Sequence, residues 1–212
     1  MVQVVKPTVA HVRERFLPLS ETFIYQFMKQ GQAKTRPVAV YVHRDNEASF
    51  RAFPEDEVVE ADIAGPDVDL APFEVVNVMN ILYHIVEPSL FERALANLAS
   101  LTAPGGWLVL SDALGSREMQ PASHVRFRPL ASYQDRLPQL GFAIKVVEPA
   151  HILLNGGVSQ AMSWAPSRVQ RLVRRGEEAL APILYALDGS SILARWANMR
   201  ILVAQKVFST GG

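Results

Sequence analysis

The chain has 212 residues, of which 49% are hydrophobic and 20% charged, and its 21 basic side chains balance its 21 acidic ones. A chain of this length can bury a full core and is most simply one globular domain, and a net charge of zero argues against nucleic-acid binding or a general attraction to acidic membranes. Cysteine is absent, which excludes disulfides, thiolate metal ligands and a cysteine nucleophile.

The N-terminal sequence shows no targeting signal. MVQVVKPTVAHV lacks the basic segment and apolar run of a signal peptide, and no apolar stretch approaches the ~20 residues that span a bilayer. Together with the absence of cysteine, these features predict a cytoplasmic protein without a membrane span.

The first third of the chain predicts three strands and one helix. The β-branched run at 8–12 indicates a first strand, and the apolar runs at 37–43 and 58–63 indicate a second and a third. Between the first two strands, apolar residues recur at helical spacing over 23–28, and Gly31 is placed to end that helix.

The middle of the chain predicts one complete parallel crossover unit. A strand at 73–79 leads to an amphipathic helix over 90–98, which begins near Pro88 and ends at the Pro-Gly-Gly turn of 104–106. A second apolar strand follows at 107–110.

The remaining segments continue the alternation, with a weak helix at 133–140, a strand at 142–147, a helical pattern at 168–185 and a last strand at 199–207. Alternating strands and helices predict an α/β fold, a three-layer sandwich in which a mostly parallel sheet is covered on both faces. In such sheets ligands bind beyond the carboxyl ends of the strands. Function is therefore expected in the loops after the first, third and fourth strands.

Residues 56–207 resemble class I S-adenosylmethionine (SAM)-dependent methyltransferases. The matching pieces are Glu60-Ala61-Asp62-Ile63, the strand from Phe73 with Leu82-Tyr83-His84-Ile85, the Pro104-Gly105-Gly106 turn, Gly141-Phe142 and a final strand ending in Gln205-Lys206. The resemblance implies a Rossmann-like fold with an antiparallel last strand, and SAM as cofactor. Residues 156–197 would form a helical insertion before that strand, as a cover or a homodimer surface.

The resemblance also implies which residues hold the cofactor. Asp62 would face the adenine amino group and Ile63 would pack on the adenine ring. Val78 and Met79, at the end of the fourth predicted strand, would border the methionine part of SAM. Asp45 follows the second predicted strand and either holds a ribose or is simply exposed in its loop.

His84 lies in the loop after the fourth predicted strand and has two interpretations. As a catalytic residue, its imidazole would take the proton from a substrate hydroxyl during methyl transfer. Alternatively, it orders its own loop through backbone hydrogen bonds, because many enzymes of this type catalyse mainly by placing nucleophile and methyl group in line.

A second polar group follows the fifth predicted strand, in a region that usually faces substrate in methyltransferases. Arg126 and Arg128 alternate on an extended segment, so they would project the same way and clamp a carboxylate or phosphate; otherwise they are exposed, solvated charges. This region, which begins with His124, resembles an Arg-x-Arg-x-hydrophobic-x-x-Tyr stretch that is often seen in methyltransferases of surface-polysaccharide synthesis and that here ends at Tyr133. This likeness implies a sugar acceptor.

Residues 8–54 instead resemble the beginning of family 4 glycosyltransferases, which have the GT-B fold. Pro-Leu-Ser-Glu-Thr-Phe-Ile at 18–24 follows the first predicted strand, where a methyltransferase would carry an acidic residue and a glycine-rich turn. The chain is thus interpreted as a glycosyltransferase-like beginning at 1–55 joined to a methyltransferase-like core at 56–155 and 198–208.

These features favour a SAM-dependent methyltransferase that acts on oxygen of a sugar or related small molecule. Two alternatives stay open: a glycosyltransferase-type domain that binds an acceptor, and a catalytically silent, chimeric Rossmann-like scaffold. The sequence carries no paired-histidine metal motif, so no metal site is predicted.

Overall fold

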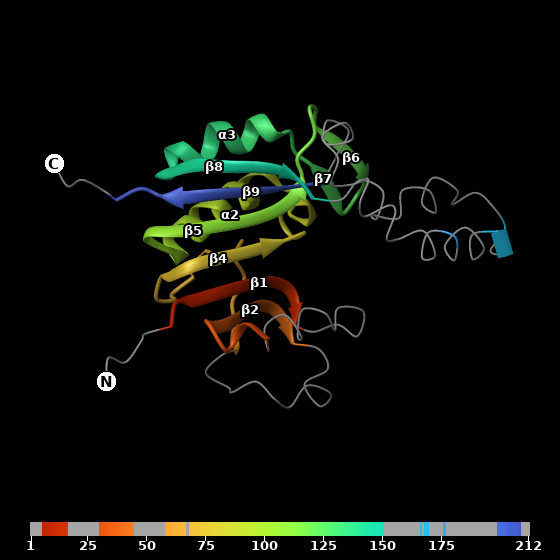
Figure 1. Ribbon diagram of the computed structural model, residues 1–212. Coiled ribbons are helices and arrows are strands. Elements are labelled where there is room, and N and C mark those ends of the chain that lie inside the picture. Colours follow the sequence, from red (N-terminus) through yellow and green to blue (C-terminus); the bar gives the residue numbers. More distant parts are fainter. Residues whose placement is uncertain are drawn as a thin grey trace, which may run out of the picture.

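The computed structural model describes residues 6–16, 30–44, 58–66, 68–150, 166, 168–169, 176 and 199–208. The central element is a seven-stranded sheet in the order β3-β2-β1-β4-β5-β9-β8 (Figure 1). Its strands are β1 (Thr8–Phe16), β2 (Arg36–Arg44), β3 (Val58–Glu60), β4 (Phe73–Met79), β5 (Thr102–Ala113), β8 (Phe142–Pro149) and β9 (Met199–Lys206).

The connecting elements are a 3-10 helix η4 (Leu82–His84), the helices α2 (Pro88–Leu101) and α3 (Leu130–Gln139), and a hairpin of β6 (Met119–Ala122) and β7 (Val125–Phe127). Strands β1 to β5 pair in parallel, whereas β9 pairs antiparallel with both β5 and β8. The expected α/β, Rossmann-like fold with a mostly parallel sheet and an antiparallel last strand is confirmed.

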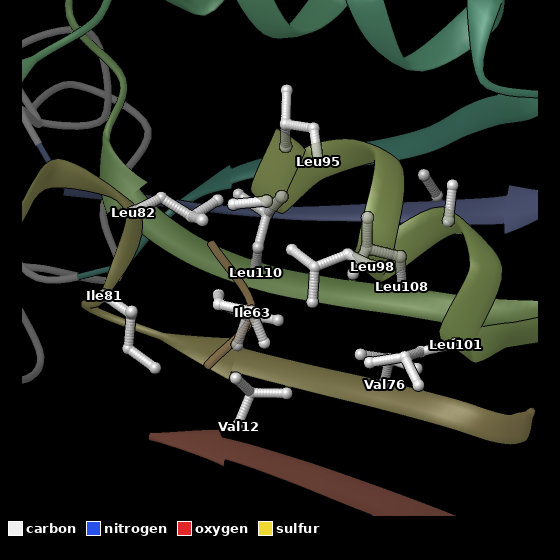
Figure 2. Close-up of a cluster of buried hydrophobic side chains, with 14 of the residues drawn as sticks. Val12, Ile63, Val76, Ile81, Leu82, Leu95, Leu98, Leu101, Leu108 and Leu110 are labelled. Carbon is white, nitrogen blue, oxygen red and sulfur yellow. The ribbon is translucent and has the colours of Figure 1, made fainter. Parts of the chain in front are cut away.

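Both described α-helices cover the same face of the sheet. The ring of Phe91 in α2 meets the ring of Tyr133 in α3 edge-on at 5.5 Å between centroids, and Glu92 forms an ion pair with Arg136. Apolar side chains of α2 pack on alternate residues of the central strands, because successive strand residues point to opposite faces (Figure 2). This cluster includes Val12, Ile63, Val76, Leu95, Leu98, Leu108 and Leu110.

The helix predicted between the first two strands and the helical insertion expected at 156–197 fall mostly outside the described residues. Gln30 and Gly31 are helical, and the Gly31 carbonyl accepts hydrogen bonds from the amides of Lys34 and Thr35, so a helix ends at Gly31 as predicted. Within the insertion, residues 168, 169 and 176 are helical.

The turn at 104–106 differs from its expected role. Helix α2 ends earlier, at Leu101, and β5 begins at Thr102, so the turn lies inside the strand as an irregularity in its pairing with β4. Gly105 has a φ of 76°, and a Cβ on Gly106 would lie 2.9 Å from the Glu74 carbonyl oxygen. Close approach of two backbones therefore explains the second glycine.

The sheet reverses its order between β1 and β4, from which the chain runs outward in both directions. The β6–β7 hairpin lies beyond the carboxyl ends of β1 and β4 (Figure 1). The sequence indicated this region only as one extended segment. Its base is closed by a bridge between Gly115 and Pro129 and a hydrogen bond from the Leu130 amide to the Gly115 carbonyl. The fold thus brings the hairpin to the carboxyl ends of the parallel strands, where a ligand is expected.

Candidate functional site

The turn after β3 presents an exposed carboxylate. Asp62 Oδ1 accepts a hydrogen bond from the Ala64 amide at 2.9 Å, and the Asp62 carbonyl accepts one from the Gly65 amide at 2.8 Å. A Cβ on Gly65 would lie 2.9 Å from that carbonyl oxygen, so the turn favours glycine there. The local sequence therefore fixes the direction of the Asp62 side chain.

Helix α2 holds this turn in place. Asn97 Nδ2 donates to the carbonyls of Ile63 at 2.8 Å and Gly65 at 3.0 Å, and Arg93 Nη1 donates to the Ala64 carbonyl at 3.4 Å. The sequence predicted this helix as amphipathic but did not single out Asn97, because its partners lie more than thirty residues away in the chain.

Two expected cofactor residues are core residues in the structure. Ile63 is 3% exposed and Val78 is 0% exposed, and both belong to the hydrophobic core cluster, in which Figure 2 shows Ile63. Neither side chain therefore has exposed surface for the contact that was expected, that of Ile63 with the adenine ring and that of Val78 with the methionine part of SAM. Met79, one residue further along β4, points to the opposite face and is partly exposed.

Asn80, directly after β4, was missed by sequence reasoning. It adopts a left-handed φ of 58°, its amide donates to the Ser111 carbonyl at 3.0 Å, and Ser111 Oγ donates to Asn80 Oδ1 at 2.8 Å. Asparagine tolerates this backbone region better than most residues. The sequence signal was its place directly after the fourth predicted strand, whose carboxyl end was expected to face a ligand.

His84 and His124 lie close together although they come from separate loops. His84 is the last residue of η4, His124 lies in the turn between β6 and β7, and both are exposed. Their ring planes are 9° from parallel, with centroids 6.3 Å apart. Tyr83 lies beside both loops, with its ring 4.3 Å from that of His84 and 5.8 Å from that of Phe127. The structure thus brings two of the predicted site residues, His84 and His124, into one cluster of aromatic side chains.

Arg126 and Arg128 do project the same way, as expected, but toward the protein itself. Both donate to the Val86 carbonyl, at 3.1 and 3.3 Å. Arg126 also forms an ion pair with Glu118, with Nη2 and Oε1 2.7 Å apart. Neither arginine is the free clamp that was expected, and Arg128 is not a solvated charge, because it is 6% exposed.

Tyr133 is also buried, at 0% exposure, which corrects its expected place facing a substrate. Its hydroxyl donates a short hydrogen bond to Asp112 Oδ2, while Asp112 Oδ1 accepts one from the Ala113 amide at 2.7 Å. Burial raises the pKa of Tyr133 well above 10.0, which keeps the hydroxyl a donor. A side chain of α3 therefore fastens the carboxyl end of β5.

Asp112 is the buried acid of this region, and sequence reasoning did not single it out. Burial raises its pKa from 3.8 to about 6, against the opposing effects of the Tyr133 hydrogen bond, the Ala113 amide and the charge of Arg128. The rule that ligands gather at the carboxyl ends of parallel strands pointed to this position, because Asp112 lies near the end of β5.

Several expected residues lie outside the described part of the chain. They are Asp45, which was expected to meet a ribose, and the segment 17–29, whose lack of glycine set the sequence apart from the family pattern. Within the described residues, no group of three or more histidine or acidic side chains is placed to hold a metal ion. Each described helix is too short or too polar to cross a bilayer.

The sequence matches no known protein-family model and no curated protein. The fold, in contrast, is similar to many solved structures. The cyclase SpnF is 15% identical, with alignment over 97% of this chain and 77% of its own and a TM-score of 0.57. A SAM-dependent methyltransferase from Mesorhizobium loti is 15% identical, with 97% and 93% covered and a TM-score of 0.54.

A third similar structure is the 1,6-didemethyltoxoflavin-N1-methyltransferase of Burkholderia thailandensis with bound 1,6-didemethyltoxoflavin and S-adenosylhomocysteine. It is 15% identical, with 96% of this chain and 72% of its own covered and a TM-score of 0.56. The chain has the fold of SAM-dependent methyltransferases. At these identities the likeness establishes the fold alone, and SpnF, described as a cyclase, illustrates that one fold hosts several activities.

These comparisons confirm the methyltransferase part of the sequence interpretation at the level of fold. SAM, the cofactor expected from the sequence, is named for the Mesorhizobium loti enzyme, and the Burkholderia thailandensis enzyme holds S-adenosylhomocysteine. The glycosyltransferase likeness of residues 8–54 stays a prediction. In the structure, β1 and β2 of that segment pair in one sheet with β4, with His11 opposite Asn77, so both parts of the chain contribute to one sheet.

Proposed function

We propose that the protein is a SAM-dependent methyltransferase that transfers a methyl group to an oxygen of a sugar or related small molecule. The observation that carries the proposal is the fold, which solved SAM-dependent methyltransferases share over nearly the whole chain. The sugar is suggested only by the sequence around 124–133.

Asp62, Asn97 and Met79, near the carboxyl ends of the parallel strands, support the proposal of an adenosyl site. Asp62 is exposed, and its carboxylate is oriented by the Ala64 amide, as required to accept hydrogen bonds from an amino group. Asn97 holds the Asp62 turn from α2, and Met79 offers partly exposed apolar surface at the end of β4. In this proposal Asp45 holds the ribose from the loop after β2.

On the acceptor side we assign His84 and His124. The bound cofactor would supply an electrophilic methyl group. His84 would take the hydroxyl proton of the acceptor on a ring nitrogen while the methyl group leaves the sulfur of SAM for the acceptor oxygen, with S-adenosylhomocysteine as the leaving product. His124, with its ring parallel to that of His84, would form the other wall of the acceptor position.

Isothermal titration calorimetry with SAM and with S-adenosylhomocysteine tests the proposal. We expect binding at one site, and a rise in thermal stability worth ~2.7 kcal/mol at a ligand concentration of one hundred times Kd. Asp62→Asn should weaken binding of both ligands, whereas Asp69→Asn is the matched control, because Asp69 is an exposed acid on the following loop.

The same experiment separates the alternatives. No heat with either ligand at high protein concentration would overturn the proposal. A stability shift with UDP or GDP instead would favour a glycosyltransferase-type domain, and a midpoint that no ligand moves would favour a silent scaffold. Release of S-adenosylhomocysteine from SAM in the presence of a panel of sugars would then identify the acceptor.

A further inference from the structure

Arg128 makes an unusual set of contacts for an arginine. Its guanidinium donates to the Leu82 carbonyl at 3.3 Å, the Ile85 carbonyl at 2.6 Å and the Val86 carbonyl at 3.3 Å. All three carbonyls belong to the segment 82–86, which carries His84 in its middle. One buried cation therefore gathers the backbone of the loop that presents the proposed catalytic imidazole.

The guanidinium lies on an aromatic platform that is itself fixed. Its central carbon is 3.7 Å from the centroid of the Phe91 ring, and the Phe91 ring meets the edge of Tyr133. Tyr133 is bonded to Asp112 at the end of β5. A chain of contacts thus runs from the sheet through α3 and α2 to Arg128, and it ends on the 82–86 carbonyls.

These contacts suit an arginine better than any other residue. Its planar group donates in several directions at once while its face lies on a ring, and a desolvated cation over an aromatic face is favourable. Burial lowers the pKa of Arg128 from its ordinary value, and the charge of Arg126 lowers it further, whereas Tyr133, Asp112 and Glu118 act in the opposite direction. Arg126 adds a second bond to the Val86 carbonyl from the same strand segment.

We propose that Arg128 is a positioning residue that fixes the 82–86 segment and thereby sets the place and direction of the His84 imidazole relative to His124. The proposal depends on the proposed function only in calling His84 catalytic. The positioning itself is a property of the protein without cofactor or acceptor, so it is tested without them.

The test uses histidine-labelled protein and two variants of matched charge. Arg128→Met removes the donors but keeps an apolar side chain, whereas Arg136→Met removes an arginine of α3 that pairs with Glu92 of α2 and does not contact the loop. Two signals are measured: the imidazole resonance of His84, assigned with His84→Gln, and hydrogen exchange of the amides in 82–86. The His84 amide donates to the Ile81 carbonyl and the Ile85 amide to the Leu82 carbonyl, which makes both amides reporters of the order of this segment.

We expect Arg128→Met to move or broaden the His84 resonance and to raise exchange in 82–86 by roughly tenfold or more, with much smaller changes in β5 and α2. Arg128→Lys should recover part of both signals, since one ammonium can still donate to a carbonyl, and Arg136→Met should leave both unchanged.

The proposal fails if Arg128→Met lowers overall stability while the His84 resonance and the exchange of 82–86 keep their wild-type values. That result would make Arg128 a purely structural residue. If Arg128→Met does not fold, Arg128→Lys serves instead, because it keeps the charge but loses the planar set of donors; wild-type values of the His84 resonance and of exchange in 82–86 in that variant would equally overturn the proposal. None of these outcomes depends on whether SAM binds.

Discussion

The imidazole rings of His84 and His124 lie nearly parallel, 9° apart in plane and 6.3 Å apart in centroid, although one follows β4 and the other is carried by the β6–β7 hairpin. Two arginines hold the loop that carries His84 near the hairpin that carries His124. Arg128 donates to the Ile85 carbonyl of the 82–86 loop, and Arg126 joins the hairpin strand β7 to the same loop by donating to the Val86 carbonyl.

The first prediction concerns this pair. With an acceptor found in the sugar panel, His84→Gln should lower the rate of methyl transfer by roughly 10²- to 10⁴-fold, the usual contribution of a general base. His124→Gln should mainly weaken acceptor binding and raise KM. Both variants should bind S-adenosylhomocysteine like the wild type, as calorimetry would check. An unchanged rate in His84→Gln would leave the imidazole the role of ordering its loop.

The second prediction concerns the Asp62 turn. Asn97→Ala removes the amide that joins the Ile63 and Gly65 carbonyls to α2, and should cost about 1–3 kcal/mol of unfolding free energy. It should also weaken binding of S-adenosylhomocysteine, because Asp62 loses its fixed direction. Ser100→Ala is the control: its hydroxyl bonds only to the Ala96 carbonyl within the same helix. Equal affinities in the two variants would count against a role for this turn in binding.

The third prediction concerns the hydroxyl of Tyr133. Tyr133→Phe leaves the buried Asp112 carboxylate without its strongest donor and should lower unfolding free energy by about 1.5–3 kcal/mol at neutral pH, as for other hydrogen bonds to charged groups. The loss should shrink at pH 4, where Asp112 is mostly protonated in the folded protein. Urea unfolding at both pH values measures it, and a loss that does not change with pH would refute the explanation.

The fourth prediction concerns Asp112 itself. Its pKa is raised from 3.8 to about 6, so between these values the folded state binds more protons than the unfolded state. Its contribution to stability is therefore full below pH 3.8 and is lost as the pH rises toward about 6, by at most about 3 kcal/mol.

Other acids act in the opposite direction over part of this range, since a hydrogen bond from Thr8 lowers the pKa of Glu74. The difference between the wild type and Asp112→Asn isolates the effect. Relative to the variant, the wild type should lose stability from pH 4 to pH 6.5 and then stay level. A constant difference across that range would mean that Asp112 ionises as it does in the unfolded chain.

The fifth prediction tests the close approach of β4 and β5. Gly106→Ala would place its Cβ 2.8 Å from the Ala103 carbonyl oxygen and 2.9 Å from that of Glu74, and backbone atoms move only at a cost. We expect a loss of about 1–3 kcal/mol in unfolding free energy. Gly115→Ala, whose nearest contact would be 3.8 Å, should be close to neutral. Similar stabilities for the two variants would show that the strands can separate freely at this point.

Much of the fold could be predicted because the signals are local. The strand at 73–79 was predicted with its observed bounds, and the helix at 90–98 lies inside the observed Pro88–Leu101, since alternation and helical periodicity depend only on near neighbours. The hairpin at 119–127 was missed as a pair of strands. It is short, its residues are partly exposed, and no strong apolar alternation marks it.

The candidate site was only partly predictable, for a different reason. Asp62 and His84 were predicted from their positions after strands, and both are exposed, so their roles stay predictions. Arg128 and Tyr133 were placed against a substrate, yet both are buried. The sequence does not distinguish a polar residue that faces solvent beyond the carboxyl ends of the strands from one that bonds to a neighbouring loop. The reason is that its bonding partners lie far away in the chain.

The sequence by itself indicated the strands of the main sheet and its helices, through periodicity and turn residues, and its resemblance to class I methyltransferases implied the antiparallel last strand. Only the tertiary structure decided that Asn97 holds the Asp62 turn, that Asp112 meets Tyr133, and that Arg128 gathers the carbonyls of the His84 loop. Those contacts join residues distant in sequence, and burial leaves each polar group no alternative to the partner that packing brings beside it.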